Sequence, residues 1–132
     1  MGLIATSNNH IILIYNSQNS TGNQAKAYVT TSEKSIYTID TAKDALTATQ
    51  WVEVAEGLHT AISQLINTKH PNFIQLYGDD VNMEDSEWLK VLEKNPQLVS
   101  EPILIVESNY YKIANPSSIT TYLNTKNSEK DN

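Results

Sequence analysis

The order of apolar and polar positions predicts alternating strands and helices in the first third of the chain. Residues 11–15, IILIY, form a short β-branched run typical of a buried strand, and residues 35–40, SIYTID, alternate as a second strand. Between them, Ser20 or Thr21 is expected to cap a helix that reaches about Lys34. The predicted inward positions of this helix are Ala25, Tyr28 and Val29. A helix between two consecutive strands favours a parallel crossover.

Helical periodicity dominates the middle of the chain. Apolar residues recur at helical spacing over residues 51–58, again over 62–66, and in a third helix over about 84–94. We interpret Gly57 as a boundary of the first helix, and Asn95-Pro96 ends the third. The intervening residues 69–84 are rich in Pro, Gly, Asn and Asp and predict a loop. The predicted inward residues are Trp51, Val54, Ala55, Leu58, Ile62, Leu65, Ile66, Trp88, Val91 and Leu92.

The last third predicts a hairpin and a closing helix. Two apolar runs, residues 102–107 and 110–114, are separated by Ser108-Asn109, which suits a tight turn. Asn115 is a good helix cap and Pro116 suits the first helical position. The inward stripe that follows is Ile119, Tyr122 and Leu123. The order of elements predicts an α/β domain over residues 1–123, with a mixed sheet of about four strands, helices on both faces and a helical insertion, followed by a frayed polar tail, 124–132.

Composition excludes several classes of chemistry. The 132 residues include no cysteine, so disulfides, thiolate catalysis and cysteine-ligated metals are ruled out. All nine basic residues are lysines, so the bidentate grip of arginine on oxyanions is missing. A net charge of -6 disfavours nucleic acid and anionic membranes as partners. No apolar stretch is long enough to span a membrane, and we expect a cytoplasmic protein.

Metal and cofactor sites find little support. An acidic stretch could suggest a calcium loop, but it lacks the central glycine and closing glutamate of an EF-hand, and an acidic helix N-terminus explains it better. The three histidines have no paired spacing on one helix face, and no glycine-rich phosphate loop occurs. We therefore expect neither a metal nor a cofactor. The residues concerned are Asp79, Asp80, Asn82, Glu84, Asp85 and Glu87, and His10, His59 and His70.

Four segments in order resemble one protein family. They are YNSQNSTGNQAKAYV (15–29), LINTKHPNF (65–73), WLKVLEKNPQLVSEPILIV (88–106) and KIANPSSITTYL (112–123). Their order and spacing resemble the ArsC-type, glutaredoxin-linked arsenate reductases of the thioredoxin-like superfamily, a family that also includes Spx-like regulators. The resemblance implies a thioredoxin-like fold, and it places Pro102 at the cis-proline of that fold. The Glu101-Pro102 bond is therefore predicted to be cis.

The departures from the family fall on its working residues. The resemblance places the catalytic cysteine at Asn19, beside Ser20 and Thr21, which are kept. It places three substrate-binding arginines at Asn67, Glu101 and Asn115. A carboxamide cannot replace a thiolate, and Glu101 repels an oxyanion. Arsenate reduction and other thiol redox chemistry are therefore excluded, and the active site is degenerate.

A vestigial polar cleft is the one candidate for binding. Most of its members are neutral hydrogen-bonding groups beside a helix N-terminus, and an alternative interpretation is that they only cap helices and close turns. The leading hypothesis is a non-catalytic module, monomeric, that binds a protein or peptide partner. The alternative is a small-molecule binder or enzyme that works without thiols. The cleft residues are Asn16, Ser17, Asn19, Ser20, Thr21, Asn67, Glu101, Pro102 and Asn115.

Overall fold

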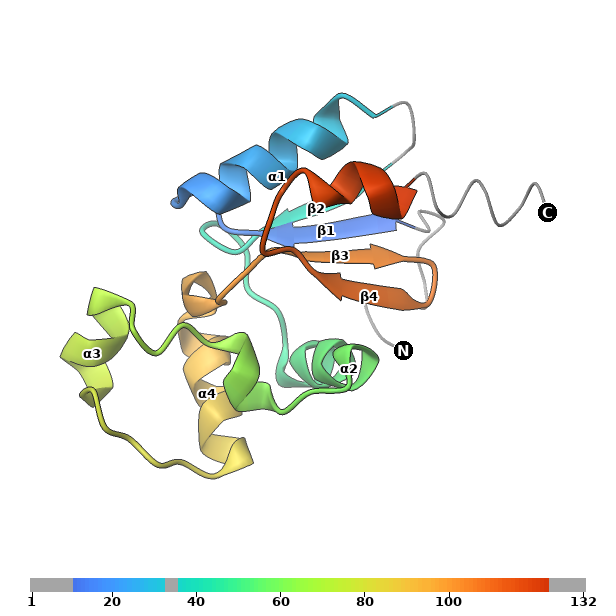
Figure 1. Cartoon of the computed structure of the whole chain (residues 1–132). Coiled ribbons are helices and arrows are strands. Elements are labelled where there is room, and N and C mark those ends of the chain that lie inside the picture. The colour runs from blue at the N-terminus through green and yellow to red at the C-terminus, as the bar shows by residue number, and fades with distance from the viewer. Residues whose placement is uncertain (1–10, 33–35, 124–132) are drawn as a thin grey trace.

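A four-stranded mixed sheet with helices on both faces organises the chain (Figure 1). The computed structural model describes residues 11–32 and 36–123. Strands β1 (Ile11–Tyr15), β2 (Tyr37–Asp40), β3 (Ile103–Val106) and β4 (Asn109–Lys112) lie in the order β2-β1-β3-β4. β1 pairs with β2 in parallel, whereas β3 is antiparallel to both β1 and β4. The predicted fold class and the predicted parallel crossover are both confirmed.

The central strands are buried on both faces, and alternate side chains enter two separate cores. Leu13 packs with Ala25 and Val29 of helix α1 (Ser20–Thr30), and residues 118–123, which are also helical, cover the same face. Ile12 and Ile14 enter the larger core on the opposite face. This two-sided burial explains why β1 reads as a continuous apolar run instead of an alternating one.

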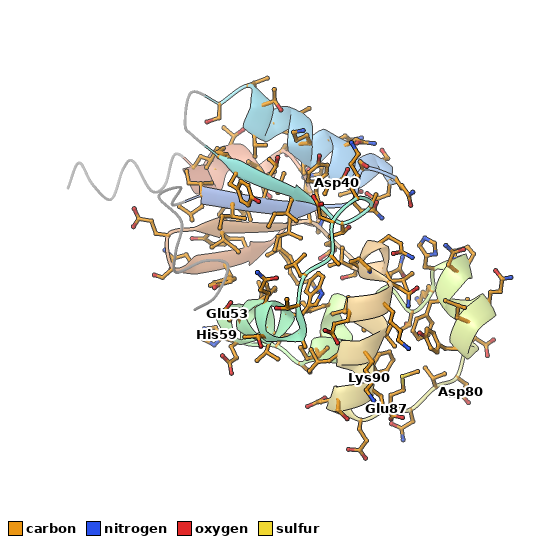
Figure 2. All side chains as sticks on the ribbon, turned by 180° about the vertical axis from the view of Figure 1, so that it is seen from behind. Asp40, Glu53, His59, Asp80, Glu87 and Lys90 are labelled. Atoms are coloured by element: carbon orange, nitrogen blue, oxygen red, sulfur yellow. The ribbon has the colours of Figure 1, made fainter. Side chains whose placement is uncertain are left out.

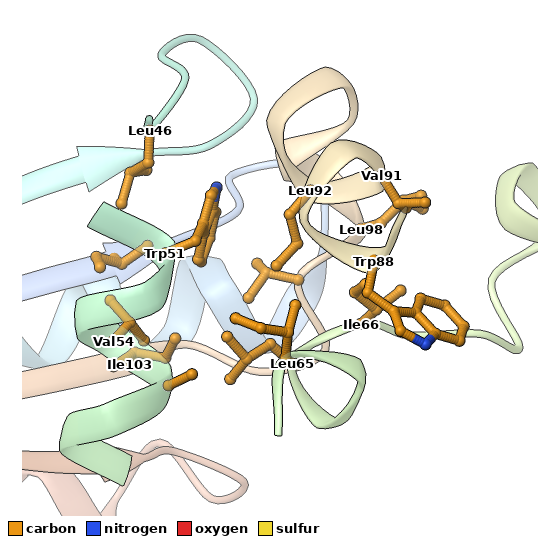
Figure 3. Packing of buried hydrophobic residues seen from close by; sticks show 14 of the residues in the cluster. Leu46, Trp51, Val54, Leu65, Ile66, Trp88, Val91, Leu92, Leu98 and Ile103 are labelled. Atoms are coloured by element: carbon orange, nitrogen blue, oxygen red, sulfur yellow. The ribbon is translucent and has the colours of Figure 1, made fainter. Parts of the chain in front are cut away.

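The larger core is built by helix α2 (Ala48–Leu58), 3-10 helix η1 (Ile62–Leu65), helices α3 (Pro71–Tyr77) and α4 (Asp85–Lys94), and 3-10 helix η2 (Pro96–Leu98). Figure 3 shows Trp51 of α2 and Leu92 of α4 converging on this core, and both are fully buried. All the predicted inward residues of α2 and α4 are buried except Leu58, which packs at the rim of the core. The second predicted helical segment, 62–66, is the short 3-10 helix η1.

Helix α3 lies within residues 69–84, where a loop was predicted, so that prediction is wrong. Pro71 occupies the first turn, and the side chain of His70 caps the helix. Phe73 is fully buried and stacks on Trp88 of α4 at a centroid distance of 5.9 Å. This tertiary contact stabilises a seven-residue helix. Its sequence pattern did not predict a helix, because the apolar run is short and is bordered by Pro71, Asn72 and Gly78.

Helix α1 differs from its prediction at both ends. Its N-cap is Asn19, and Ser20, which had been expected to cap it, is the first helical residue. The helix ends at Thr30, and Lys34 lies outside the described residues. Tyr28, predicted to face inward, is 40% exposed. The inner face of α1 is therefore narrower than its sequence pattern suggested.

Two turns also differ from their predictions. Gly57 lies inside α2, and the helix ends instead at Leu58, followed by His59 as its C-cap with a left-handed φ of 56°. Gly57 is needed for another reason, since a Cβ there would collide with the ring of Tyr110 on β4. The β3–β4 turn consists of Glu107 and Ser108, with Glu107 at a φ of 59°, one residue earlier than predicted.

The closing segment follows its prediction in part: a helix forms, but it begins at residue 118, two residues later than predicted. The Asn115 side-chain oxygen accepts a hydrogen bond from the backbone N–H of Ser117 at 3.2 Å, which closes a turn just before this helix. Ile119 and Leu123 are buried, and the half-buried Tyr122 stacks on a tyrosine of β4. The predicted tail, 124–132, lies outside the described residues.

The Glu101-Pro102 peptide bond is trans, so the cis prediction is wrong. A trans bond is the default for proline, with a preference of about 0.5–1 kcal/mol. The Pro102 carbonyl accepts a hydrogen bond from the Ile113 N–H at 2.8 Å, which extends the β3–β4 pairing by one step.

None of the helices formed by the described residues is both long and apolar enough to cross a membrane.

Candidate functional site

The strand order brings most of the predicted site residues to one edge of the sheet. β1 and β2 are parallel and end at the same edge, while β3 begins there and β4 ends there. We call the segments that meet at this place the loop edge: residues 16–22, 40–42, 100–102 and 113–115.

Asn16 ties the loop after β1 to a distant segment. Its side chain is 5% exposed, and its Nδ2 donates to the carbonyl of Gln97 in η2 at 2.9 Å. Its Oδ1 accepts from the backbone N–H of Gln18 at 2.8 Å. Both ends of this amide are therefore used within the fold, which makes Asn16 a structural residue of the loop edge.

Asn19 occupies the position at which the family resemblance implies a cysteine, and it caps α1. Its Oδ1 accepts from the backbone N–H of Gly22 at 2.6 Å, and its own N–H donates to the Asn16 carbonyl at 3.3 Å. Gly22 is packed so closely that a Cβ there would collide with the Asn16 carbonyl oxygen. The side chain at this position therefore stabilises a helix start.

Asp40, a residue that the sequence interpretation missed, organises the same loop. It is 7% exposed at the end of β2 (Figure 2), and its Oδ1 accepts from the backbone N–H groups of Ser17 and Ala42, each at 3.0 Å. Burial acts to raise the pKa of the Asp40 carboxyl. The hydroxyl and N–H of Ser17, the N–H of Ala42 and the charge of Lys43 outweigh this effect and lower the pKa below 3.8. The sequence signal was an acidic residue at the end of a strand predicted to run parallel to β1.

Ser20 and Thr21 lie in the first turn of α1. Ser20 is exposed, and its Oγ accepts from Nε2 of Gln24 at 3.1 Å, while Thr21 is half-buried. The hydroxyl hydrogen of Ser20 can be offered to a bound molecule, because the known bond uses the oxygen as acceptor.

Glu101 stands where the resemblance implies an arginine, and it pairs with a lysine. Its Oε1 lies 3.8 Å from Nζ of Lys112, with both side chains about one-third exposed. The same Nζ donates to the carbonyl of Gln64 at 3.1 Å. Such a pair contributes little stability, but it compensates the charge of Glu101 at the loop edge.

Asn115 belongs to the loop edge through its position in the chain, whereas Asn67 lies outside it. The N–H of Asn67 donates to the carbonyl of Leu98 at 2.8 Å, and its Oδ1 accepts from the N–H of Lys69 at 3.1 Å. Asn115 is two residues beyond Ile113, which bonds to Pro102, and its side-chain oxygen is used within its own turn. Neither amide contacts Asn16 or Asn19 through any of the described hydrogen bonds.

The acidic stretch belongs to the start of α4. Glu84 and Glu87 form a reciprocal capping box at the helix N-terminus, as the charge pattern favoured. An open hollow of about 380 Å³, lined by residues 82–86, lies beside it. Within the described ranges, no three His, Asp or Glu side chains gather as metal ligands would. His10 lies outside those ranges.

Comparisons with known proteins identify the fold. No family model matches the sequence, and no curated protein matches it. Solved structures do match. An arsenate reductase from Vibrio cholerae is 12% identical, covers 84% of this chain and 95% of its own, and superposes with a TM-score of 0.73. A Yersinia pestis protein, provisionally described as an arsenate reductase, is 18% identical with coverages of 84% and 98% and a TM-score of 0.74.

A third match is an ArsC-related protein from Brucella melitensis, with 15% identity, coverages of 89% and 97% and a TM-score of 0.58. The chain thus has the thioredoxin-like fold of ArsC-type arsenate reductases, as the sequence resemblance implied, and it has no cysteine.

Proposed function

We propose that this chain is a degenerate, non-catalytic relative of the ArsC-type arsenate reductases that binds a protein or peptide partner at the loop edge. The observation that carries the proposal is Asn19. Its oxygen holds the N–H of Gly22 at 2.6 Å, at the place where the resemblance puts the nucleophile. The chain keeps the fold of the family but has a helix-capping asparagine where the resemblance places the reactive cysteine. Such a chain can still bind a partner although it cannot perform the thiol chemistry.

The chemistry of the loop edge supports a polar, extended ligand. Asn19 and Ser20 are exposed at the start of α1, and both carry hydrogen-bonding groups without charge. A peptide backbone offers donors and acceptors in alternation, so neutral amides and hydroxyls match it. An oxyanion matches less well, because the chain has no arginine and the positive charge of Lys112 is already paired with Glu101.

A matched pair of variants tests this location. Ser20→Glu adds a carboxylate to the first turn of α1, and Thr49→Glu adds one to the first turn of α2, away from the loop edge; both positions are exposed. A negative charge at a helix N-terminus is tolerated, so both variants should fold. Partners are captured from lysate with the wild-type chain, identified, and then measured by titration with each purified variant.

The expected result is a loss of affinity of about tenfold or more for Ser20→Glu, with Thr49→Glu near wild type. Equal affinity of the wild type and both variants for the captured partner would show that the partner does not bind at the loop edge. A metabolite that raises the thermal midpoint of the wild type and of Thr49→Glu, and that Ser20→Glu fails to bind, would replace the partner hypothesis with the small-molecule alternative.

Restoring the thiol should not restore arsenate reduction. Asn19→Cys introduces the only thiol of the chain, so alkylation by iodoacetamide reports it without background. Three missing charged hydrogen bonds, each worth about 1.5–3 kcal/mol, correspond to roughly three to six powers of ten in rate if they add. Glutathione- and glutaredoxin-coupled turnover within tenfold of an active ArsC-type reductase would contradict the loss of substrate binding.

A further inference from the structure

The cap of α3 requires a neutral histidine. The backbone N–H of Asn72 donates to Nδ1 of His70 at 3.0 Å. A ring nitrogen accepts a hydrogen bond only when it carries no proton, so this contact requires a neutral His70 with its proton on Nε2. Protonation converts Nδ1 into a donor that faces another donor, and the cap is lost.

The surroundings of His70 do not compensate a positive charge. The first turn of α3 contains no acidic residue, and Lys69 precedes His70 in the chain. The positive end of the helix dipole also disfavours a cation there. The one ion pair within 4.0 Å among the described residues joins Lys112 and Glu101, so no carboxylate is paired with His70.

None of the charged side chains on neighbouring elements forms a described hydrogen bond or ion pair with the His70 ring. Asp80 follows the opposite end of α3, and Glu87 lies near the start of α4 (Figure 2). At the end of α4, Glu93 accepts from the N–H of Ala48 at 3.2 Å, and Lys94 is positive.

We propose that α3 is an acid-sensitive element whose first turn opens when His70 is protonated. The fully buried Phe73, stacked on Trp88, keeps the middle of the helix docked, so the opening is confined to residues 70–72. Ile74 and Leu76 of the same helix are 41% and 58% exposed. The first turn that opens on acidification therefore lies next to these exposed apolar side chains. The proposal does not depend on the function assigned to the loop edge.

The tautomer provides the first test. Nitrogen-15 NMR of the full chain, with the histidines assigned by His70→Asn and His59→Asn, should show His70 at pH 7.5 with its proton on Nε2. A dominant Nδ1–H tautomer would overturn the proposal.

Hydrogen exchange of the Asn72 amide, corrected for the intrinsic rate, provides the second test. Between pH 7.5 and 5.5, wild-type protection should fall about fivefold, as expected for loss of a cap. His70→Asn supplies an acceptor that does not titrate and should abolish the fall. His70→Ala should be poorly protected at both pH values, and the control His59→Asn should keep the wild-type response. A pH response that persists in His70→Asn, or none in the wild type, would overturn the proposal.

Discussion

The starts of helices α1 and α3 use the same device with different chemistry. In α1 the side chain of Asn19 accepts from the backbone N–H of Gly22 at 2.6 Å, and in α3 the side chain of His70 accepts from that of Asn72 at 3.0 Å. The carboxamide cannot titrate, whereas the imidazole can. A cap can therefore be permanent or conditional, depending only on which acceptor stands before the first turn.

The two caps also differ in what surrounds them. The α1 cap lies in a network in which Asn16 and Asp40 hold the loop, and Gly22 lies against a backbone carbonyl. In the described hydrogen bonds, the cap of α3 is supported only from its own segment, where the N–H of His70 donates to the carbonyl of Asn67 at 3.2 Å, and the fully buried residue of α3 is Phe73. Two helices with similar side-chain caps can therefore differ in how many tertiary contacts hold their first turns. The following substitutions measure that difference in the free energy of unfolding.

Phe73→Ala should have the largest effect. It removes a fully buried ring that stacks on Trp88 and packs 5.0 Å from Tyr77, and such truncations cost about 3–5 kcal/mol. Urea denaturation followed by circular dichroism measures the free energy of unfolding. The exposed neighbour Gln75→Ala is the control and should stay within about 0.5 kcal/mol of wild type. A small loss in Phe73→Ala would mean that α3 is held by other contacts.

Gly22→Ala should destabilise the α1 start by roughly 2–3 kcal/mol, because the new methyl group meets backbone that cannot move easily. Helix propensity alone predicts the opposite sign, a gain of about 1 kcal/mol. The same denaturation experiment decides between them, with the exposed Gln24→Ala as the control. Increased stability of Gly22→Ala would show that the loop relaxes.

Asp40→Asn should cost about 1.5 kcal/mol at pH 7, since it removes a charged acceptor. The folded state lowers the pKa of Asp40 below the ordinary value of 3.8, so the stabilisation is present above that pH and disappears as the pH falls through the folded value. The denaturation midpoints of the two chains should therefore differ by a constant amount from pH 7 down to about pH 4, and the difference should shrink as the pH falls further to 2.5. A difference that stays constant over the whole of this range would contradict the assignment.

Asn19→Ala should have the smallest effect, about 1 kcal/mol, and the loss should be the same at pH 7.5 and 5.5. Asn115→Ala, which removes the side-chain acceptor of the turn before the closing helix, should cost a similar amount. Thermal denaturation at both pH values measures the losses. A pH-dependent loss in Asn19→Ala would remove the contrast with His70.

The candidate site was predictable in part. The sequence placed Asn16, Ser17 and Asn19 in one loop after a strand, and the fold brings Pro102 to the same edge. It did not reveal that Asn16 bonds to Gln97 or that Asp40 receives the N–H of Ser17, because these partners are 81 and 23 residues apart. Hydrogen bonds between distant loops have no periodicity and leave no pattern in a single sequence.

What the sequence by itself determined was the apolar framework and the missing chemistry. The run at residues 11–15, the inward stripes of α2 and α4, and the absence of cysteine all follow from local spacing or composition. Only the tertiary structure decided that residues 71–77 are helical, that Gly57 makes room for Tyr110, and that a buried aspartate joins two parallel strand ends. The reason is that each of these features is stabilised by groups far away in the chain, whose proximity exists only once the sheet and its two cores have formed.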